Sequence, residues 1–197
     1  HYQTTPRDRW DYTATQQIML ADLPLGEGGA DRRVVMQAPK NGFFYVLDAA
    51  DGELISATPF TQQNWTTGEF DENGRPVLIQ DAVDMALTVV IPGPTGAHNW
   101  HPMAFNPDTG LVYIPVNEIP FFYDKTRNVE DSKSFWNIGY DAAAGWPVEY
   151  PAGTLDAVAD MDGGSLLAWD PVKAEPRWAV PFALPLNGGV LSTDAGL

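Results

Sequence analysis

The stretch Gly42-Phe43-Phe44-Tyr45-Val46-Leu47-Asp48 returns later in the chain, in altered form, as Gly164-Ser165-Leu166-Leu167-Ala168-Trp169-Asp170. The similarity continues without a gap, so that residues 42–60 align with residues 164–182. Identical pairs in this alignment are Gly42/Gly164, Asp48/Asp170, Glu53/Glu175, Ala57/Ala179, Pro59/Pro181 and Phe60/Phe182. Each copy reads as an apolar strand, an Asp turn and a second strand, which predicts a structural unit that repeats.

Further strand and turn signals surround the first copy. Residues 33–38 and 43–47 are rich in β-branched and aromatic side chains and are separated by a turn that contains Asn-Gly, which predicts a hairpin. Residues 17–23 and 54–57 read as flanking strands, and residues 106–115 as another turn followed by a strand. A recurring strand, Asp turn and strand favours an all-β fold of β-propeller blades, with a β-sandwich as the alternative. Trp178 in the second copy suits a contact with a neighbouring blade.

Composition limits the classes of partner. The chain has 197 residues, of which 44% are hydrophobic, and this is enough for a packed core. Its net charge of -15 repels a phosphate backbone and disfavours nucleic acid and anionic membrane surfaces. No apolar run approaches the roughly 20 residues that a membrane-spanning helix needs. The chain has no Cys, which excludes a disulfide framework, a thiolate metal site and a Cys nucleophile within it.

Both ends of the chain resemble the interior of a longer sequence. The chain starts at His1-Tyr2 as if in the middle of a strand. It stops at Thr193-Asp194-Ala195-Gly196-Leu197, where a turn should lead into a new strand. We therefore expect an internal piece of a larger protein, with residues 1–197 forming one partial propeller domain.

Residues 118–163 interrupt the repeating pattern. This segment is aromatic, with Phe121, Phe122, Tyr123, Phe135, Trp136, Tyr140, Trp146 and Tyr150. It is too aromatic for a flexible linker, and loops of this length in a compact domain are usually functional. The segment is either a satellite core packed on one face or a wall over a ligand cavity.

Residue types alone identify no catalytic centre. Asp11 follows Trp10 and precedes Tyr12, two rings that could remove water from its carboxylate, and a lone loop Asp is usually structural. Lys40 lies in the predicted hairpin turn, where it is either solvent-exposed or available to an anionic ligand. His98 and His101 have too few neighbouring ligands to predict a metal site.

Several longer motifs, taken together and in order, resemble the pyrroloquinoline quinone (PQQ) dependent alcohol dehydrogenases, most closely their quinohaemoprotein branch. The resembling segments are residues 1–16, 36–48, 96–103, 106–115, 168–171 and 187–189. They cover nearly the whole chain. The resemblance implies an eight-bladed propeller in the periplasm, of which this chain would supply about three blades, together with a long aromatic insertion at residues 118–163.

The resemblance also implies roles for individual residues. The Asp that follows Trp in the family motif is the catalytic base and a metal ligand, which corresponds to Asp11 here. The Lys of Ala-Pro-Lys-Asn-Gly, Lys40, would bind the quinone oxygens, and the Asn-Trp pair, Asn99 and Trp100, would contact PQQ. Lanthanide-using relatives carry a second Asp two residues after the base, where this chain has Thr13, so the resemblance favours calcium.

These implications give the expected function. The chain would take part in oxidation of small alcohols to aldehydes, with cytochrome c or a quinone as electron acceptor. The family's other metal ligands and the haem-attachment motif are not in this sequence, so a haem c would lie in a domain outside it. We expect the 197 residues alone to bind PQQ and calcium weakly and to be inactive. The alternative is a non-catalytic propeller scaffold built from the same repeat.

Overall fold

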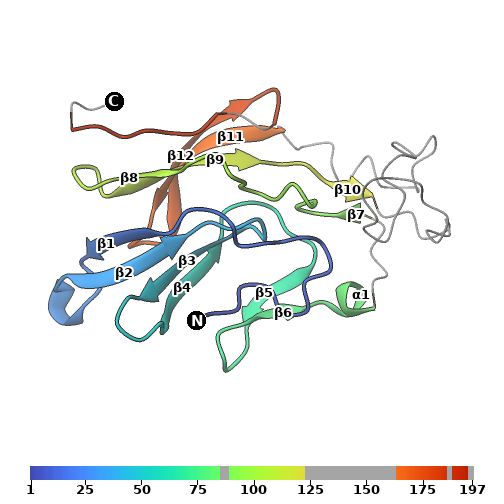
Figure 1. Cartoon of the computed structure of the whole chain (residues 1–197), viewed down its shortest axis with the longest axis horizontal. Helices are drawn as coiled ribbons and strands as arrows, with labels where there is room; N and C mark the ends of the chain where they lie inside the picture. Colours follow the sequence, from blue (N-terminus) through green and yellow to red (C-terminus); the bar gives the residue numbers. More distant parts are fainter. Residues whose placement is uncertain (85–88, 123–162, 186–187, 195–197) are drawn as a thin grey trace.

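The computed structural model describes residues 1–84, 89–122, 163–185 and 188–194. Two four-stranded antiparallel sheets lie face to face (Figure 1). The first has the order β1-β2-β3-β4, with β1 Met19–Leu23, β2 Arg32–Gln37, β3 Phe43–Asp48 and β4 Leu54–Pro59. The second has the order β12-β11-β9-β8, with β8 Ala104–Asn106, β9 Leu111–Asn117, β11 Gly164–Asp170 and β12 Glu175–Phe182.

The remaining elements are short. β5 Thr66–Phe70 pairs with β6 Pro76–Leu78, and β7 Val89–Val90 pairs with β10 Phe121–Phe122. A 3-10 turn at Glu27–Gly29 and one helix, α1 Gln80–Val83, complete the described elements. No helix among the described residues has the length and hydropathy to cross a membrane. The predicted all-β class is confirmed. Of the expected blades, two are four-stranded sheets, and the other described strands form two-stranded sheets.

The two copies of the repeat have the same backbone structure. In the first copy, the pairing of β3 with β4 shifts register between Val46 and Leu47. In the second, the pairing of β11 with β12 shifts between Ala168 and Trp169, the equivalent positions of the alignment. The same irregularity at the same place supports a true structural repeat, because bulges fix the twist and register of a strand pair.

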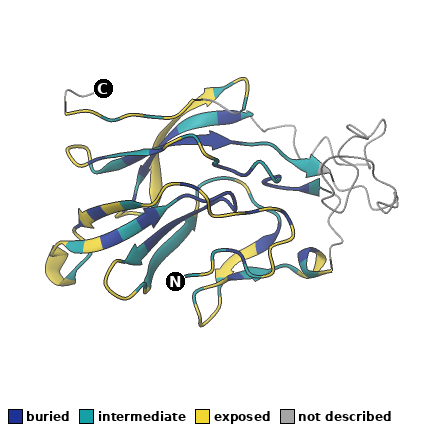
Figure 2. Ribbon diagram, in the orientation of Figure 1, coloured by how far each residue is buried: buried dark blue, intermediate teal, exposed yellow. Residues whose placement is uncertain are grey.

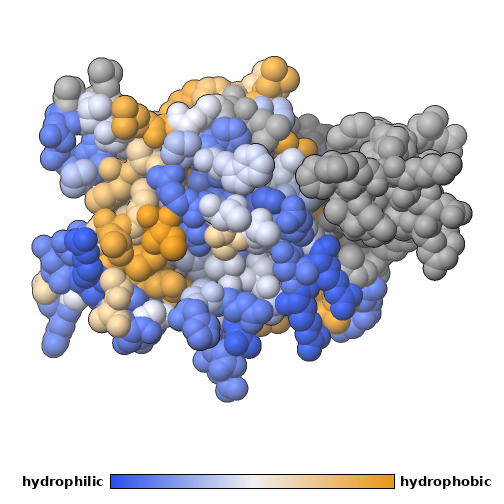
Figure 3. All heavy atoms as spheres, in the orientation of Figure 1, coloured by the Kyte–Doolittle hydropathy of each residue, from blue (hydrophilic) through white to orange (hydrophobic). Residues whose placement is uncertain are grey.

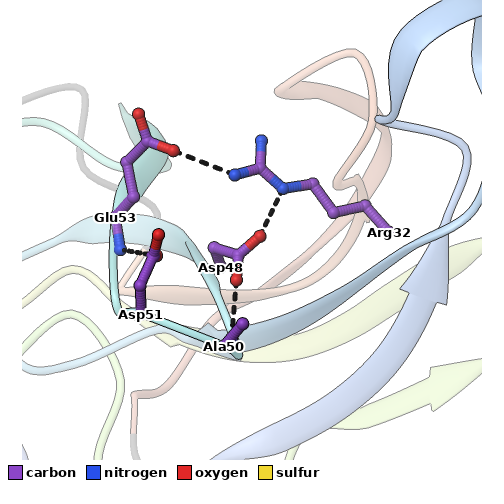
Figure 4. Close-up of polar contacts among 5 residues, drawn as sticks. All are labelled: Arg32, Asp48, Ala50, Asp51 and Glu53. Atoms are coloured by element: carbon purple, nitrogen blue, oxygen red, sulfur yellow. Dashed lines mark hydrogen bonds and ion pairs between the residues drawn. The ribbon is translucent and has the colours of Figure 1, made fainter.

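The Asp turns of the two copies are also alike. Asp48 Oδ1 accepts a hydrogen bond from the Ala50 amide at 2.6 Å, and Asp170 Oδ1 accepts one from the Val172 amide at 3.1 Å. In the first copy Arg32 bonds both Asp48 and Glu53, the latter at 2.9 Å, which ties β2 to the turn (Figure 4). The hydrogen bond from Arg32 holds the pKa of Asp48 below its usual value.

Strand β3 divides its side chains between two cores. Phe44 and Val46 enter the core between the two sheets, whereas Phe43 and Tyr45 enter an aromatic cluster with Trp10, Tyr12 and Trp65. A strand buried on both faces reads as a continuous apolar run, which is why its sequence shows no alternation. Figure 2 shows the buried residues concentrated in the inner strands, whereas the turns and most of β12 are exposed.

Contact between the two sheets is made by a Trp that the sequence analysis did not single out. Trp169 of β11 is buried, and its ring centroid lies 5.8 Å from that of Phe44 on β3. Trp178, the predicted residue, is 43% exposed and lies against Tyr113 of its own sheet. Its contact with a further blade stays a prediction. Figure 3 shows an apolar patch on the side of the molecule where β1 and β2 lie. Leu20, a residue of β1, is exposed.

Candidate active site

The segment before β1 is fastened to the first sheet near both of its ends. Asn41 donates from Nδ2 to the carbonyl oxygen of Thr4 at 3.0 Å. Gln37 donates from Nε2 to the carbonyl oxygens of Ala14 at 3.2 Å and Gln16 at 2.7 Å. These bonds fix residues 4–16 in space although they contain no regular structure, and Asp11 lies between the two anchors.

The aromatic neighbours of Asp11 determine where its carboxylate points. Trp10 and Tyr12 are 2% and 1% exposed and belong to the aromatic cluster with Trp65, and the Tyr12 hydroxyl donates to the carbonyl oxygen of Pro92. Asp11 between them has a φ of 63°, a left-handed conformation that Asp tolerates better than most residues. Its side chain is 64% exposed. The expectation that the two rings desolvate Asp11 is therefore wrong, because both rings turn into the core and the carboxylate turns outward.

Lys40 is the charge partner of Asp11. Its ammonium Nζ lies 2.9 Å from Asp11 Oδ2, and its side chain is only 8% exposed. Burying an ammonium is costly unless it is paired, and Asp11 supplies the anion. The sequence pattern does not show that these two residues pair, because they lie far apart in the chain. Arg9, the cation nearest to Asp11 in sequence, reaches the carbonyl oxygen of Val83 at 3.4 Å.

A second loop, residues 93–103, passes directly over Lys40. The Ala97 amide donates to the carbonyl oxygen of Lys40 at 2.9 Å. Gly96 has a φ of 78°, and a Cβ at this position would lie 2.3 Å from Lys40 Cγ. Only a residue without a side chain allows this approach, so Gly96 is the reason that the loop can lie against Lys40.

Asn99 and Trp100 lie on the same loop, two and three residues beyond Ala97. Asn99 donates from Nδ2 to the carbonyl oxygen of Thr95 at 2.7 Å. Its Oδ1 is buried and has no hydrogen-bond partner among the described residues, and the same is true of Thr95 Oγ1. Trp100 is 78% exposed and makes no ring contact within the described part of the chain. The structure therefore joins Asp11, Lys40 and the Asn99 loop, and leaves the Trp100 ring in solvent.

Asn41 is a member of the site that sequence analysis treated as a turn residue. It is fully buried. Besides its bond to Thr4, its Nδ2 lies 3.2 Å from Thr5 Oγ1 and 2.9 Å from the hydroxyl of Tyr45. Burial raises the pKa of Tyr45, so the phenol stays protonated and donates to the Thr4 carbonyl oxygen at 3.1 Å. Asn41 directly follows Lys40, and its bonds to Thr4 and Thr5 therefore tie the segment that carries Asp11 to the Lys40 turn.

The two loop histidines do not form a metal site. His98 is fully buried, and its Nδ1 and Nε2 each lie 2.7 Å from a carbonyl oxygen, those of Ala38 and His101. Neither ring nitrogen is free to bind a metal. The described residues contain no group of three His, Cys, Asp or Glu side chains that could hold an ion. Of the predicted insertion, residues 123–162 lie outside the described residues.

Comparison with known proteins places the fold and the site in context. Residues 1–69 match the family model of the PQQ glucose/ethanol/alcohol dehydrogenase β-propeller domain. The whole chain aligns at 48% identity with quinohemoprotein alcohol dehydrogenase ADH IIB of Pseudomonas putida and spans 27% of that protein's length. The crystal structure of quinohemoprotein alcohol dehydrogenase from Comamonas testosteroni superposes on 98% of the chain with a TM-score of 0.76 at 42% identity. The chain covers 28% of that structure.

A more distant structure extends the comparison. A europium-containing methanol dehydrogenase superposes on 93% of the chain with a TM-score of 0.68 at 26% identity. These findings confirm the resemblance to the PQQ-dependent alcohol dehydrogenases and the propeller character of the sheets. They do not address individual residues, so the roles of Asp11, Lys40, Asn99 and Trp100, and the extent of the domain over residues 1–197, stay predictions.

Proposed function

We propose that this chain belongs to a PQQ-dependent alcohol dehydrogenase, in which it contributes the catalytic base and part of the cofactor site. The observation that carries the proposal is the buried ammonium of Lys40, 2.9 Å from the carboxylate of Asp11 and directly beneath the Gly96–Asn99 loop. Three segments distant in sequence thus bring a base, a cation and an amide together. The similarity to quinohemoprotein alcohol dehydrogenases supports this reading.

The residues present fit PQQ, an anionic and planar quinone. Lys40 offers a cation, and the Oδ1 of Asn99 and the Oγ1 of Thr95 are polar atoms without partners among the described residues. A buried polar atom without a partner is costly, which fits a ligand that completes its hydrogen bonds. Lys40 and Asn99 would hold the cofactor, and the exposed ring of Trp100 offers a face against which it could stack.

The side chains supply the proton chemistry of alcohol oxidation. PQQ, when bound, supplies an electron-poor quinone that accepts the hydrogen of the alcohol carbon as a hydride. The carboxylate of Asp11 accepts the proton of the alcohol hydroxyl, which leaves an aldehyde after the hydride has gone. Lys40 would offer a hydrogen-bond donor and a positive charge to the quinone oxygen on which negative charge grows. The exposed carboxylate of Asp11 is accessible to a small alcohol.

Calcium is the cation that we propose beside Asp11. A carboxylate oxygen is a suitable ligand for a hard cation, and the exposed Asp11 side chain could turn one oxygen to a metal. One structural neighbour is named as europium-containing, but Thr13 stands here at the position where lanthanide-using relatives carry a second Asp. A hydroxyl adds less negative charge than a carboxylate, which favours the divalent ion.

The proposal also covers the location of the whole protein and its electron acceptor. We propose a periplasmic location and cytochrome c or a quinone as electron acceptor. A haem c would be carried outside these 197 residues, because covalent haem attachment requires Cys and the chain has none.

The test is an Asp11→Asn exchange in the full-length protein, assayed by dye-linked alcohol oxidation with added PQQ and calcium. We expect kcat to fall about 100-fold to 10,000-fold, the usual effect of losing a general base. Asp22→Asn serves as the control, since it removes an exposed carboxylate paired with Arg33 and distant from the site. The PQQ content of each variant is measured in parallel, to separate lost chemistry from lost cofactor.

The same assay defines the outcomes that contradict the proposal. Undiminished oxidation by the Asp11→Asn protein would eliminate Asp11 as the base. A wild-type protein that neither binds PQQ nor oxidises alcohols would favour the non-catalytic scaffold. Activity restored to the chelator-treated enzyme by lanthanum but not by calcium would overturn the choice of cation.

A further inference from the structure

We propose that His98 is the positioning residue of this site and that it fixes Lys40 and the Asn99 loop relative to each other. The proposal rests on the proposed function, because it assigns His98 a role toward the same cofactor. His98 is fully buried, and within the described part of the chain its ring lies against the carbonyl oxygens of Ala38 and His101 and not against a predicted reacting group. His98 acts on the predicted reacting groups by holding the backbone segments that carry them.

The bonds of His98 join three segments. Its Nδ1 lies 2.7 Å from the carbonyl oxygen of Ala38, two residues before Lys40. Its Nε2 lies 2.7 Å from the carbonyl oxygen of His101, which closes the loop that carries Asn99. Its own carbonyl oxygen accepts a hydrogen bond from Gln16 Nε2 at 3.1 Å, at the end of the segment that carries Asp11. Each of the three functional segments therefore has one polar contact with this residue.

The surrounding contacts leave the loop little freedom once His98 is in place. The Ala97 amide is bonded to the Lys40 carbonyl oxygen, and its own carbonyl oxygen accepts from the Asn117 amide at 2.7 Å. The loop is thus held to Ala38 and Lys40 on one side and to Asn117 on the other. A ring that bridges Ala38 and His101 sets the distance between the Lys40 strand end and the turn of residues 98–101.

The two ring contacts connect different parts of the molecule, so their effects can be tested separately. A neutral imidazole carries one N–H and can donate to only one of the two carbonyl oxygens. The bond to Ala38 joins the loop to the Lys40 segment, whereas the bond to His101 remains inside the loop. We assign the positioning role to the bond from Nδ1 to Ala38.

Two amide variants test the two bonds independently. The amide nitrogen of His98→Asn lies near the position of Nδ1 and keeps the bond to Ala38. The amide nitrogen of His98→Gln reaches further, toward the position of Nε2, and keeps the bond to His101. In the full-length protein with calcium, PQQ affinity is measured by titration of intrinsic tryptophan fluorescence. We expect His98→Gln to bind PQQ about tenfold more weakly, a factor typical of a lost supporting hydrogen bond, and His98→Asn to stay within about threefold of wild type.

A readout that needs no cofactor accompanies the titration. Hydrogen exchange of the Ala97 amide reports its bond to the Lys40 carbonyl oxygen. We expect faster exchange in His98→Gln than in His98→Asn. If the wild-type protein bound no PQQ while the exchange rates differed as expected, the proposed function would fail and the positioning role would stand.

The control for simple destabilisation is Val34→Ala, a fully buried position in the core between the sheets. It should lower the melting temperature without weakening PQQ binding. Equal PQQ affinity and equal Ala97 exchange in both His98 variants would overturn the positioning role. The positioning role would also be overturned if PQQ affinity fell in proportion to melting temperature in both His98 variants and in Val34→Ala. His98 would then be merely structural. A larger loss in His98→Asn than in His98→Gln would contradict the assignment to the Ala38 bond.

Discussion

At the scale of single residues, the site depends on a carboxylate placed by its neighbours. Trp10 and Tyr12 both enter the aromatic cluster, and the left-handed backbone of Asp11 lets two adjacent rings do so. The side chain between them must then point outward, toward Lys40. The motif Trp-Asp-Tyr in the sequence indicates two buried rings around a polar residue. It does not indicate the direction of the carboxylate, because that depends on a φ that local sequence does not fix.

His98 gives a prediction about pH at this scale. Burial lowers its pKa below the usual 6.5, against the opposing effect of its two carbonyl neighbours, and nearby His101 lowers it further. The unfolded chain therefore binds a proton at pH values where the folded protein does not. The stability that depends on neutral His98 is complete above about pH 6.5 and is lost as the pH falls from there toward the lower pKa of the folded state.

The measurement is the free energy of unfolding by urea at several values between pH 5 and pH 8. Wild-type protein should lose stability on acidification with a contribution from His98 of at most about 1.4 kcal/mol per pH unit. The same series with His98→Gln should lack this contribution, since Gln does not titrate. Identical slopes for the two proteins would show that His98 is not buried in its neutral form.

At the scale of elements, two loops form the site by close approach. Turn residues such as Gly42 and Gly110 were predictable, because Asn-Gly and Thr-Gly turns need a positive φ that Gly supplies. The role of Gly96 was not, because its partner Lys40 lies far away in the sequence. The identity of Asn41 as a buried hub was missed for the same reason, since Thr4, Thr5 and Tyr45 become its neighbours only in the folded sheet.

A pair of glycine variants isolates this approach. Gly96 and Gly110 both have a positive φ, of 78° and 67°. A Cβ at Gly110 meets nothing within 4 Å, whereas one at Gly96 meets Lys40 Cγ at 2.3 Å. Both Ala variants should lose about 1 kcal/mol of stability from backbone strain, and Gly96→Ala should lose more because its Cβ clashes with Lys40. Only Gly96→Ala should also weaken PQQ binding, by about tenfold or more, because Lys40 must move.

Fluorescence titration with PQQ and urea unfolding of the full-length protein measure the two effects separately. If Gly96→Ala and Gly110→Ala bound PQQ equally well, Lys40 would have room to shift without consequence, and the contact would not determine the site.

At the scale of the whole molecule, the repeat predicts the two sheets but not how they meet. The gapless alignment of residues 42–60 with 164–182 correctly indicated equivalent strands and turns, and the structure adds that the register shifts of the two copies fall at aligned positions. It could not indicate that the equivalent of Leu47 in the second copy, Trp169, would span the sheets, because packing partners depend on the angle between blades. The two-stranded sheet of β7 and β10 was also missed, since these strands have only two residues each and carry no pattern.

The contact of Phe44 with Trp169 is therefore the feature to test for the assembly of the two blades. The rings lie 5.8 Å apart at 36°, one from each sheet, and both are buried in the core that the sheets share. Phe44→Leu and Trp169→Leu should each lower the free energy of unfolding by about 1–3 kcal/mol. The double variant should lose about 0.5–1.5 kcal/mol less than the sum of the two, because an aromatic pair contributes that amount beyond its buried area. Urea unfolding of the four proteins gives this coupling energy.

The matched cycle combines Phe44→Leu with Trp178→Leu, whose ring lies against Tyr113 on the second sheet and not against Phe44. Those two changes should add within about 0.5 kcal/mol, as expected for residues that share no contact. A coupling between Phe44 and Trp169 no larger than this control would mean that the sheets are held together by general apolar burial. A larger coupling would make this ring pair the specific contact that orients one blade on the next. The same contact would then also place the Lys40 turn of the first sheet beside the Gly96 loop, which leads into the second sheet.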